Sequence, residues 1–125
     1  MDDGLTIAEL AQRTGLNTQT LRSYERSGLL VGVDRGTNGR RRYTEDDLAR
    51  IRLLARLRAT GMSVADARGY AELARSESET AARRHEVLVA HRQRVLARIA
   101  QLHEDLALVE YEIQRLYPHN GSRPR

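Results

Sequence analysis

A heptad repeat in the last third of the chain limits the folds that this sequence can adopt. Between residues 77 and 117 there is no proline and no glycine, and apolar side chains recur every seven residues in two rows offset by four. The rows contain Leu88, Val95, Leu102, Val109 and Leu116, and Ile99, Leu106 and Ile113. This a/d seam predicts one helix, about 60 Å long, that needs a partner to bury its apolar stripe. All eight residues are therefore candidates for a dimer interface.

The charges beside the seam favour an antiparallel partner. A parallel dimer would set Asp105 against Glu110 of its mate. An antiparallel dimer instead sets Arg98 near Asp105, and it also sets His91 near Glu112. Each exposed pair contributes only about 0.2–1 kcal/mol, so a different coiled-coil protein is kept as an alternative partner.

The first 28 residues predict two short helices joined by a tight turn. Thr6 and Glu9 have the spacing of a capping box, and Gly15 suits the left-handed stop of the first helix. Asn17 is the expected N-cap of the second helix, and Gly28 is its stop. Two short helices in this order form a helix-turn-helix pattern.

The second helix of such a motif enters the major groove of DNA, and residues near its start face the base edges. Here these residues are Asn17, Thr18, Gln19 and Arg22. Asparagine, glutamine and arginine are the side chains that form bidentate contacts with adenine or guanine. The second helix is therefore the candidate reader of a DNA sequence, with Leu16 and Leu21 expected to face inward.

A basic hairpin is predicted directly after this helix. Leu29–Val33 is apolar and β-branched, Gly36 and Gly39 mark a turn, and Arg40–Tyr43 is expected to return as a second strand. The segment 35–42 carries four arginines and no acid. Guanidinium groups suit phosphate because they offer forked donors and keep their charge, so the hairpin is interpreted as a wing on the DNA backbone.

Two more helices should connect the wing to the long helix. Thr44 caps the third, with three acids following at its positive end, and Ser63 caps the fourth, with Asp66 three residues on. The buried stripe of the third helix is expected to contain Leu48, Ile51, Leu54, and Leu57 or Ala55.

The predicted fold is therefore mostly α. It consists of a winged helix-turn-helix DNA-binding domain over residues 1–75, a coiled-coil dimerisation helix over 76–117 and a flexible tail over 118–125.

Composition excludes several classes of protein. The formal net charge is +4, every one of the 21 basic residues is arginine, and there is no cysteine, so disulfides and thiolate metal sites are excluded. The four histidines lack the three-or-four spacing of paired helical ligands, so no metal or other cofactor is expected. No catalytic motif has supporting context, no run suits a membrane span, and the acidic start is unlike a signal peptide. We expect a cytoplasmic protein that is not an enzyme.

The order of these features resembles the MerR family of bacterial transcription regulators. The stretches that carry the resemblance are "TIAELAQRTGLNTQTLRSYERSGLL", "NGRRRYTEDDLARI" and "LRATGMSVADARGYAEL". They cover Leu5 to Leu73 closely, and the long helix matches in architecture. Two positions depart from the family pattern, because Ser23 and Arg40 stand where an aromatic residue is common.

The resemblance implies a homodimer, joined by an antiparallel coiled coil, on a pseudo-palindromic promoter in double-stranded DNA. The promoter of such regulators has a long spacer, which the protein bends and untwists for RNA polymerase. The positions that match the family's DNA contacts are Arg22 and Tyr24 on the second helix, and Arg35, Arg41 and Tyr43 on the wing, where Arg40 and Arg42 accompany them.

The signal that such a regulator would answer is open. No effector domain is expected after the long helix, so a small-molecule inducer, if one acts, would lie near Tyr70 and Leu73. Two alternatives are an architectural or excisionase-like DNA-binding protein and a coiled-coil adaptor. Salt-dependent DNA binding separates the adaptor from the other two.

Overall fold

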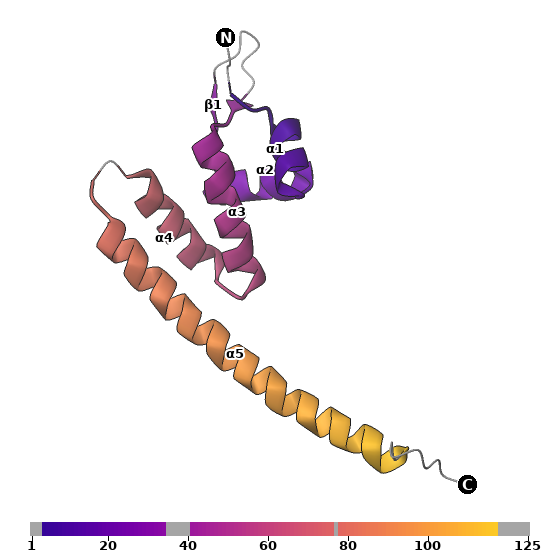
Figure 1. The fold of residues 1–125 in the computed structure, drawn as a ribbon. Coiled ribbons are helices and arrows are strands. Elements are labelled where there is room, and N and C mark those ends of the chain that lie inside the picture. Colours follow the sequence, from indigo (N-terminus) through magenta and orange to yellow (C-terminus); the bar gives the residue numbers. More distant parts are fainter. Residues whose placement is uncertain (1–3, 35–40, 77, 118–125) are drawn as a thin grey trace. The chain divides into compact units, whose positions relative to one another are not determined.

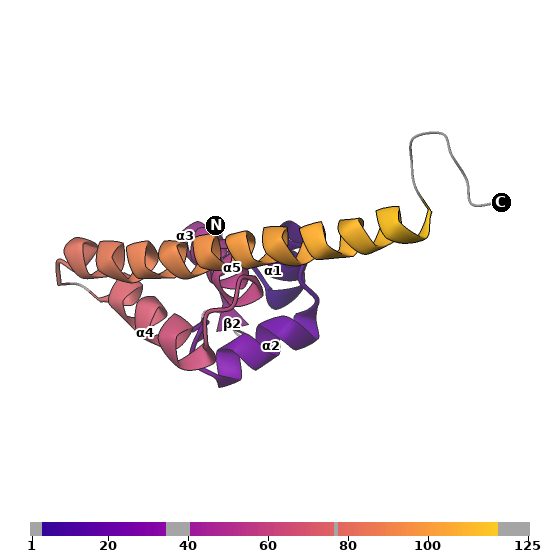
Figure 2. The same cartoon turned by 90° about the horizontal axis from the view of Figure 1, so that it is seen from below.

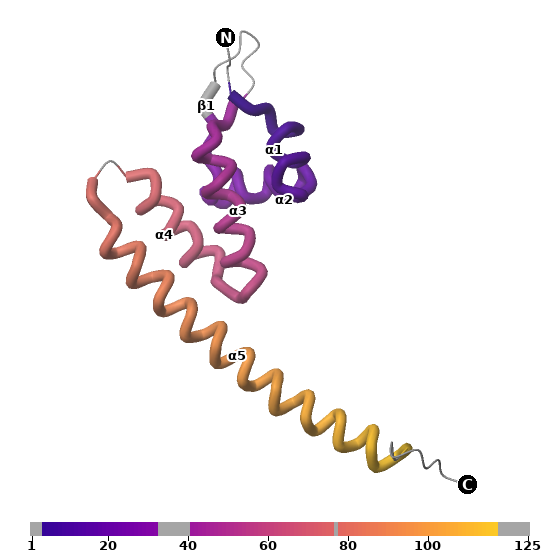
Figure 3. Tube along the Cα trace, viewed as in Figure 1, coloured from indigo at the N-terminus to yellow at the C-terminus, as the bar shows by residue number. Residues whose placement is uncertain are grey.

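The computed structural model describes residues 4–34, 41–76 and 78–117 of the chain, which divides into two compact units, Met1–Leu88 and Val89–Arg125. The elements are α1 (Ile7–Thr14), α2 (Thr18–Arg26), β1 (Val33–Asp34), β2 (Arg41–Arg42), α3 (Glu45–Ala59), α4 (Val64–Arg75) and α5 (Ala81–Leu116) (Figure 1). Figure 3 traces the order of these elements along the chain. The prediction of a mostly α fold is confirmed. Among the described helices, none has the length and apolar character that a bilayer crossing requires.

The helices of the first unit begin where their capping residues predict. The Thr6 and Glu9 side chains each accept a hydrogen bond from the other residue's backbone N–H, at 3.1 and 2.8 Å. Thr44 and Asp47 form the same reciprocal box at the start of α3. Gly15 ends α1 with φ at 78°, a left-handed conformation that glycine adopts without strain.

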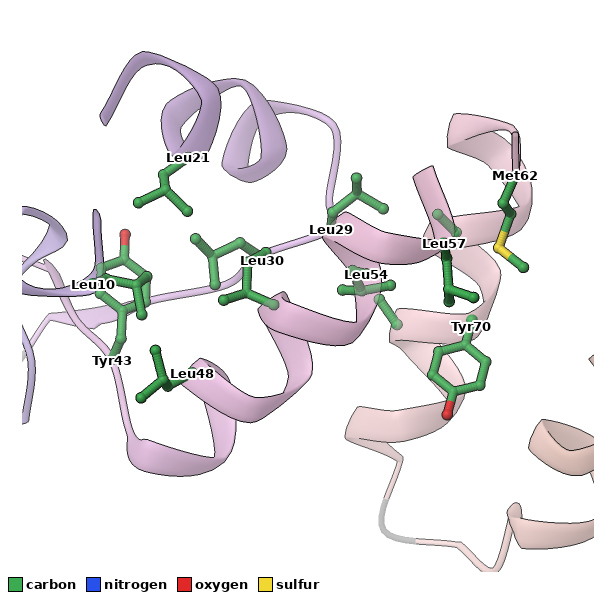
Figure 4. Packing of buried hydrophobic residues seen from close by; sticks show 13 residues of the cluster. Leu10, Leu21, Leu29, Leu30, Tyr43, Leu48, Leu54, Leu57, Met62 and Tyr70 are labelled. Carbon is green, nitrogen blue, oxygen red and sulfur yellow. The ribbon is translucent and has the colours of Figure 1, made fainter. Parts of the chain in front are cut away.

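The core of the first unit is a leucine cluster at the junction of α1, α2, α3 and α4 (Figure 4). The predicted stripe of α3 is confirmed, because Leu48, Ile51, Leu54 and Leu57 are all buried. Leu21 of α2 is buried as expected, and Leu16 packs against the cluster from the turn. The remaining buried members are Leu10, Leu29, Leu30, Tyr43, Met62, Ala67, Tyr70 and Ala71. Tyr70 is therefore a core residue.

The first strand of the predicted hairpin is shorter than expected. Leu29 and Leu30 are not in a strand, because their N–H groups donate to the Tyr24 carbonyl at 2.8 and 3.3 Å and so close the end of α2. β1 starts only at Val33 and pairs antiparallel with β2, with Val33 opposite Arg42. The predicted turn glycines, Gly36 and Gly39, lie outside the described residues.

α5 is one helix from Ala81 to Leu116 (Figure 2), close to the predicted limits of 77 and 117. Its first turns belong to the first unit, where Val87 and Leu88 pack against the leucine cluster. The compact unit consequently runs to Leu88, whereas the sequence prediction placed the end of the DNA-binding domain at residue 75. The predicted tail, 118–125, lies outside the described residues.

Candidate nucleic-acid interface

The exposed face of α2 carries the side chains that were predicted to read DNA. Gln19 and Arg22 are exposed, and Thr18 is half-buried. Arg26 follows Arg22 by four residues and is also exposed, so it shares this helical face. Sequence reasoning missed Arg26, although its spacing from Arg22 was the signal for it.

Asn17 holds the start of α2. Its side-chain oxygen accepts a hydrogen bond from the backbone N–H of Thr20 at 2.7 Å. A bidentate contact with adenine needs this oxygen together with the amide NH₂ group. Asn17 is therefore the cap of α2, and its predicted contact with a base would have to use the second lone pair of this oxygen together with the amide NH₂ group.

A groove of about 690 Å³ lies between α2, the start of α1 and β2. Four arginines line it, two from the recognition helix and two from the wing strand. The lining residues are Thr6, Ile7, Ala8, Arg22, Glu25, Arg26, Arg41, Arg42 and Tyr43. We call this hollow the arginine groove. The tertiary fold thus joins the predicted helix contacts and the predicted wing contacts in one concave, basic surface.

Arg42 lies in this groove with its guanidinium only partly used. Its Nε and NH1 atoms are buried and form no hydrogen bond within the described part of the chain. A buried donor without a partner is unfavourable, and a buried positive charge more so. An anion in the groove would relieve both costs only if the Arg42 side chain turned so that these two atoms reached the surface of the groove.

Arg41 is directed toward its own protein. Its NH1 donates to the Gly32 carbonyl at 2.9 Å, and its Nε lies 3.7 Å from Oε2 of Glu25. Half of its side chain, 54%, remains exposed. The exposed part of Arg41 can therefore still meet a phosphate, although the guanidinium already has partners in the protein.

Tyr43 is part of the core and not of the DNA-facing surface. It is 1% exposed, and its hydroxyl donates to Oε2 of Glu25 at 2.8 Å. Burial raises the pKa of the Tyr43 phenol well above its usual value, and the hydrogen bond to the Glu25 carboxylate raises this pKa further. The predicted DNA contact of Tyr43 is therefore corrected to a structural role, since a buried ring cannot reach a phosphate.

Tyr24 faces a different hollow from Arg22. Two residues along a helix are about 200° apart, so the two side chains leave α2 on opposite sides. Tyr24 is half-buried against the leucine cluster. It lines a second groove of about 650 Å³, whose other residues are Thr14, Gly15, Leu16, Arg52, Ala55, Arg56, Arg58 and Ala59. This second groove is also basic, with three arginines from α3.

Two of the predicted wing contacts, Arg35 and Arg40, lie outside the described residues.

In the second unit, α5 exposes most of the predicted seam. Six of the eight residues are 44–54% exposed in the single chain: Ile99, Leu102, Leu106, Val109, Ile113 and Leu116. Val95 is half-buried, and Leu88 packs on the core of the first unit. His91 is buried, so it is not the surface charge that the antiparallel pairing with Glu112 assumed.

Comparison with known proteins bears on the whole chain. A family model described as "MerR HTH family regulatory protein" matches residues 5–73, and one described as "MerR, DNA binding" matches residues 48–108. An uncharacterised HTH-type transcriptional regulator of Haemophilus influenzae is 36% identical over 86% of this chain and 80% of that protein. The mercuric resistance operon regulatory protein of Pseudomonas fluorescens is 32% identical over 91% of this chain and 75% of its own.

Solved structures agree with these relatives. HiNmlR, described as a MerR family regulator lacking the sensor domain and bound to promoter DNA, has a TM-score of 0.76 and 36% identity, covering 87% of this chain and 86% of its own. A MerR family regulator from Listeria monocytogenes has a TM-score of 0.79 and 30% identity, covering 89% of this chain and 84% of its own.

Proposed function

The chain belongs to the MerR family of helix-turn-helix regulatory proteins and is a DNA-binding transcriptional regulator, and we propose that it acts as an antiparallel homodimer on a pseudo-palindromic promoter. The observation that carries the proposal is the arginine groove, where recognition-helix and wing arginines converge beside α2. Such a surface follows the phosphate backbone while the exposed face of α2 meets the bases.

Each exposed side chain has a proposed role in DNA binding. Gln19 and Arg22 read base edges, because both are exposed near the start of α2. Arg26 binds phosphate from the exposed face of α2. Half-buried Arg42 also binds phosphate, once its side chain turns to bring the unpaired Nε and NH1 atoms to the groove. In the second groove, on the other side of α2, exposed Arg56 supplies a further backbone contact, whereas Arg52 and Arg58 already donate to the carbonyls of Arg13 and Met62.

The dimer forms through the exposed seam of α5. A register that sets Arg98 beside Asp105 of the second copy places Ile99 against Leu102 of that copy. The same register pairs Leu106 with Val95. It also sets Arg92, a charged residue at a seam position, against Val109 of the second copy. Two recognition helices related by a two-fold axis then face two half-sites, which explains why the operator is palindromic.

We propose that the dimer alters transcription by bending and untwisting a long promoter spacer, so that RNA polymerase engages both promoter elements. Deforming 20–30 base pairs costs about 1–6 kcal/mol, which contacts made only on the bent DNA must repay. A small-molecule inducer would act by changing this deformation. The alternatives, an architectural or excisionase-like protein and a coiled-coil adaptor, predict no change in transcription at such a promoter.

The test selects DNA sites from a random library with the purified protein and then transcribes the matching promoter in vitro. A palindrome within a long-spacer promoter, with transcription altered by the protein, supports the proposal. A palindrome without an effect on transcription, tested with and without cell extract as a source of inducer, supports the architectural alternative. No enriched site and no salt-dependent DNA binding would refute the proposed function.

A further inference from the structure

One acidic side chain, Glu25, lies in the arginine groove. Among the described residues that line the groove, it alone is acidic, and its side chain is 29% exposed. A carboxylate here repels DNA phosphate and lowers the affinity of the protein for every duplex, whatever its sequence. Glu25 therefore weakens general DNA binding at the place where four arginines strengthen it.

Glu25 joins the recognition helix to the wing. Its Oε2 atom accepts the Tyr43 hydroxyl at 2.8 Å and lies 3.7 Å from Nε of Arg41. The other side of the Arg41 guanidinium donates to the Gly32 carbonyl, just before β1. One carboxylate thus connects α2 with both segments of the hairpin.

The Tyr43 side of this connection cannot shift. A Cβ atom added to Gly32 would lie 2.7 Å from Cε1 of the Tyr43 ring, and one added to Gly4 would lie 2.8 Å from the Tyr43 carbonyl oxygen. Backbone hydrogen bonds in both directions, at 2.6 and 2.9 Å, also pair Tyr43 with Leu5. Since Tyr43 directly follows β2, its position also determines where the wing strand ends. The hydrogen bond from the Tyr43 hydroxyl to Glu25 then ties the end of that strand to α2.

We propose that Glu25 is a positioning residue that sets the sequence discrimination of this regulator. The inference rests on the proposed function. A wing free to move would follow the phosphates of any duplex. A wing held by Glu25 binds well only where the DNA shape brings a phosphate to Arg42 while Gln19 and Arg22 meet their bases. The Glu25 charge lowers the affinity for fitting and non-fitting duplexes alike, so the discrimination comes from the held position of the wing.

The test compares the affinities of the wild type and Glu25→Gln for two duplexes, the site selected by the wild type and a scrambled duplex of equal length. The variant keeps an acceptor for Tyr43 but removes the charge and releases Arg41. We expect its affinity for the scrambled duplex to rise about two- to fivefold, the effect of one partly exposed charge. Its salt slope on that duplex steepens by up to about 0.9, because one fewer carboxylate opposes the phosphates in the groove. The ratio of selected to scrambled affinity falls.

Two further variants separate positioning from charge and from folding. Glu72→Gln removes one acid from α4, outside the described lining of both grooves, so it controls for net charge. Tyr43→Phe keeps the buried ring but removes its hydroxyl donor, and we expect it to lower the affinity ratio without raising scrambled-duplex affinity. Thermal unfolding of each variant checks that the compared proteins are folded.

The inference is overturned if Glu25→Gln and Tyr43→Phe keep the wild-type affinity ratio, or if Glu25→Gln changes it only as much as Glu72→Gln does. The proposed function fails separately. A wild type that enriches no site and shows no salt-dependent DNA binding overturns that function and, with it, this inference. A wild type that enriches a site and alters transcription from the matching promoter leaves the function standing whatever the variants do.

Discussion

Truncating one seam leucine should weaken the dimer by an amount that follows from its exposure. Leu102 is 49% exposed in the single chain. Burying a whole leucine side chain contributes about 1.5–3 kcal/mol, so burying the exposed half contributes about 1 kcal/mol. Both copies carry the substitution, so Leu102→Ala should cost the dimer about 2 kcal/mol, or roughly a 30-fold higher dissociation constant. A cavity left at the seam would add to this loss.

The matched control for this substitution is Leu108→Ala on the same helix. Leu108 is more exposed, at 70%, but it lies off the seam. Sedimentation equilibrium over a range of concentrations measures the dissociation constant of each variant, and circular dichroism checks its helix content. The reasoning is refuted if Leu102→Ala leaves the dissociation constant unchanged, or if Leu108→Ala raises it equally. In either case the seam would not be the surface that holds the two copies together.

Three further predictions concern the wing and its junction with the recognition helix. Arg42→Ala should weaken binding to the selected duplex more than to the scrambled one, because only the selected site brings a phosphate to Arg42, and it should reduce the salt slope on the selected duplex by about 0.9. Anisotropy titrations at several salt concentrations would show both effects, and an unchanged slope contradicts a phosphate contact. Gly32→Ala should lower the free energy of unfolding by about 1–3 kcal/mol, because the new methyl group would overlap the Tyr43 ring, and a wild-type urea midpoint would contradict this packing. Folding raises the pKa of Tyr43. The stability that its protonated hydroxyl gives the folded protein is therefore complete below the pKa of the unfolded chain, about 10, and is lost as the pH rises above that pKa. Tyr43→Phe should therefore flatten the loss of stability above about pH 10, and urea unfolding in that range that stays parallel to the wild type would contradict the shift.

The elements of the first unit were predictable because their signals are local. A capping box joins residues three apart, so Thr6 with Glu9 and Thr44 with Asp47 mark helix starts without reference to the rest of the fold. The buried stripe of α3 follows from helical spacing in the same way. The strand predicted to start at Leu29 was wrong. Apolar residues suit a strand and a helix-ending turn equally, and only the hydrogen bonds to the Tyr24 carbonyl distinguish the two.

The DNA-facing side chains were only partly predictable. Arg22 and Gln19 lie on the exposed side of α2 as their positions indicate. Tyr43 has the motif position of a DNA contact, yet it is buried, because Gly32 leaves room for its ring, Gly4 leaves room for its backbone carbonyl, and Glu25 accepts its hydroxyl. These partners are distant in sequence, so no spacing rule reveals them.

By itself, the sequence determined where the helices start, which faces are apolar, and that the seam of α5 needs a second helix. These properties depend on residues within one or two turns of each other, and backbone hydrogen bonding makes them independent of the remaining chain. Only the tertiary structure decided which charged side chains are exposed and which pair with other parts of the protein. Glu25 and Arg41 have partners inside the fold, whereas Nε and NH1 of Arg42 have none in the described part of the chain, and these partners come from segments that are distant in sequence.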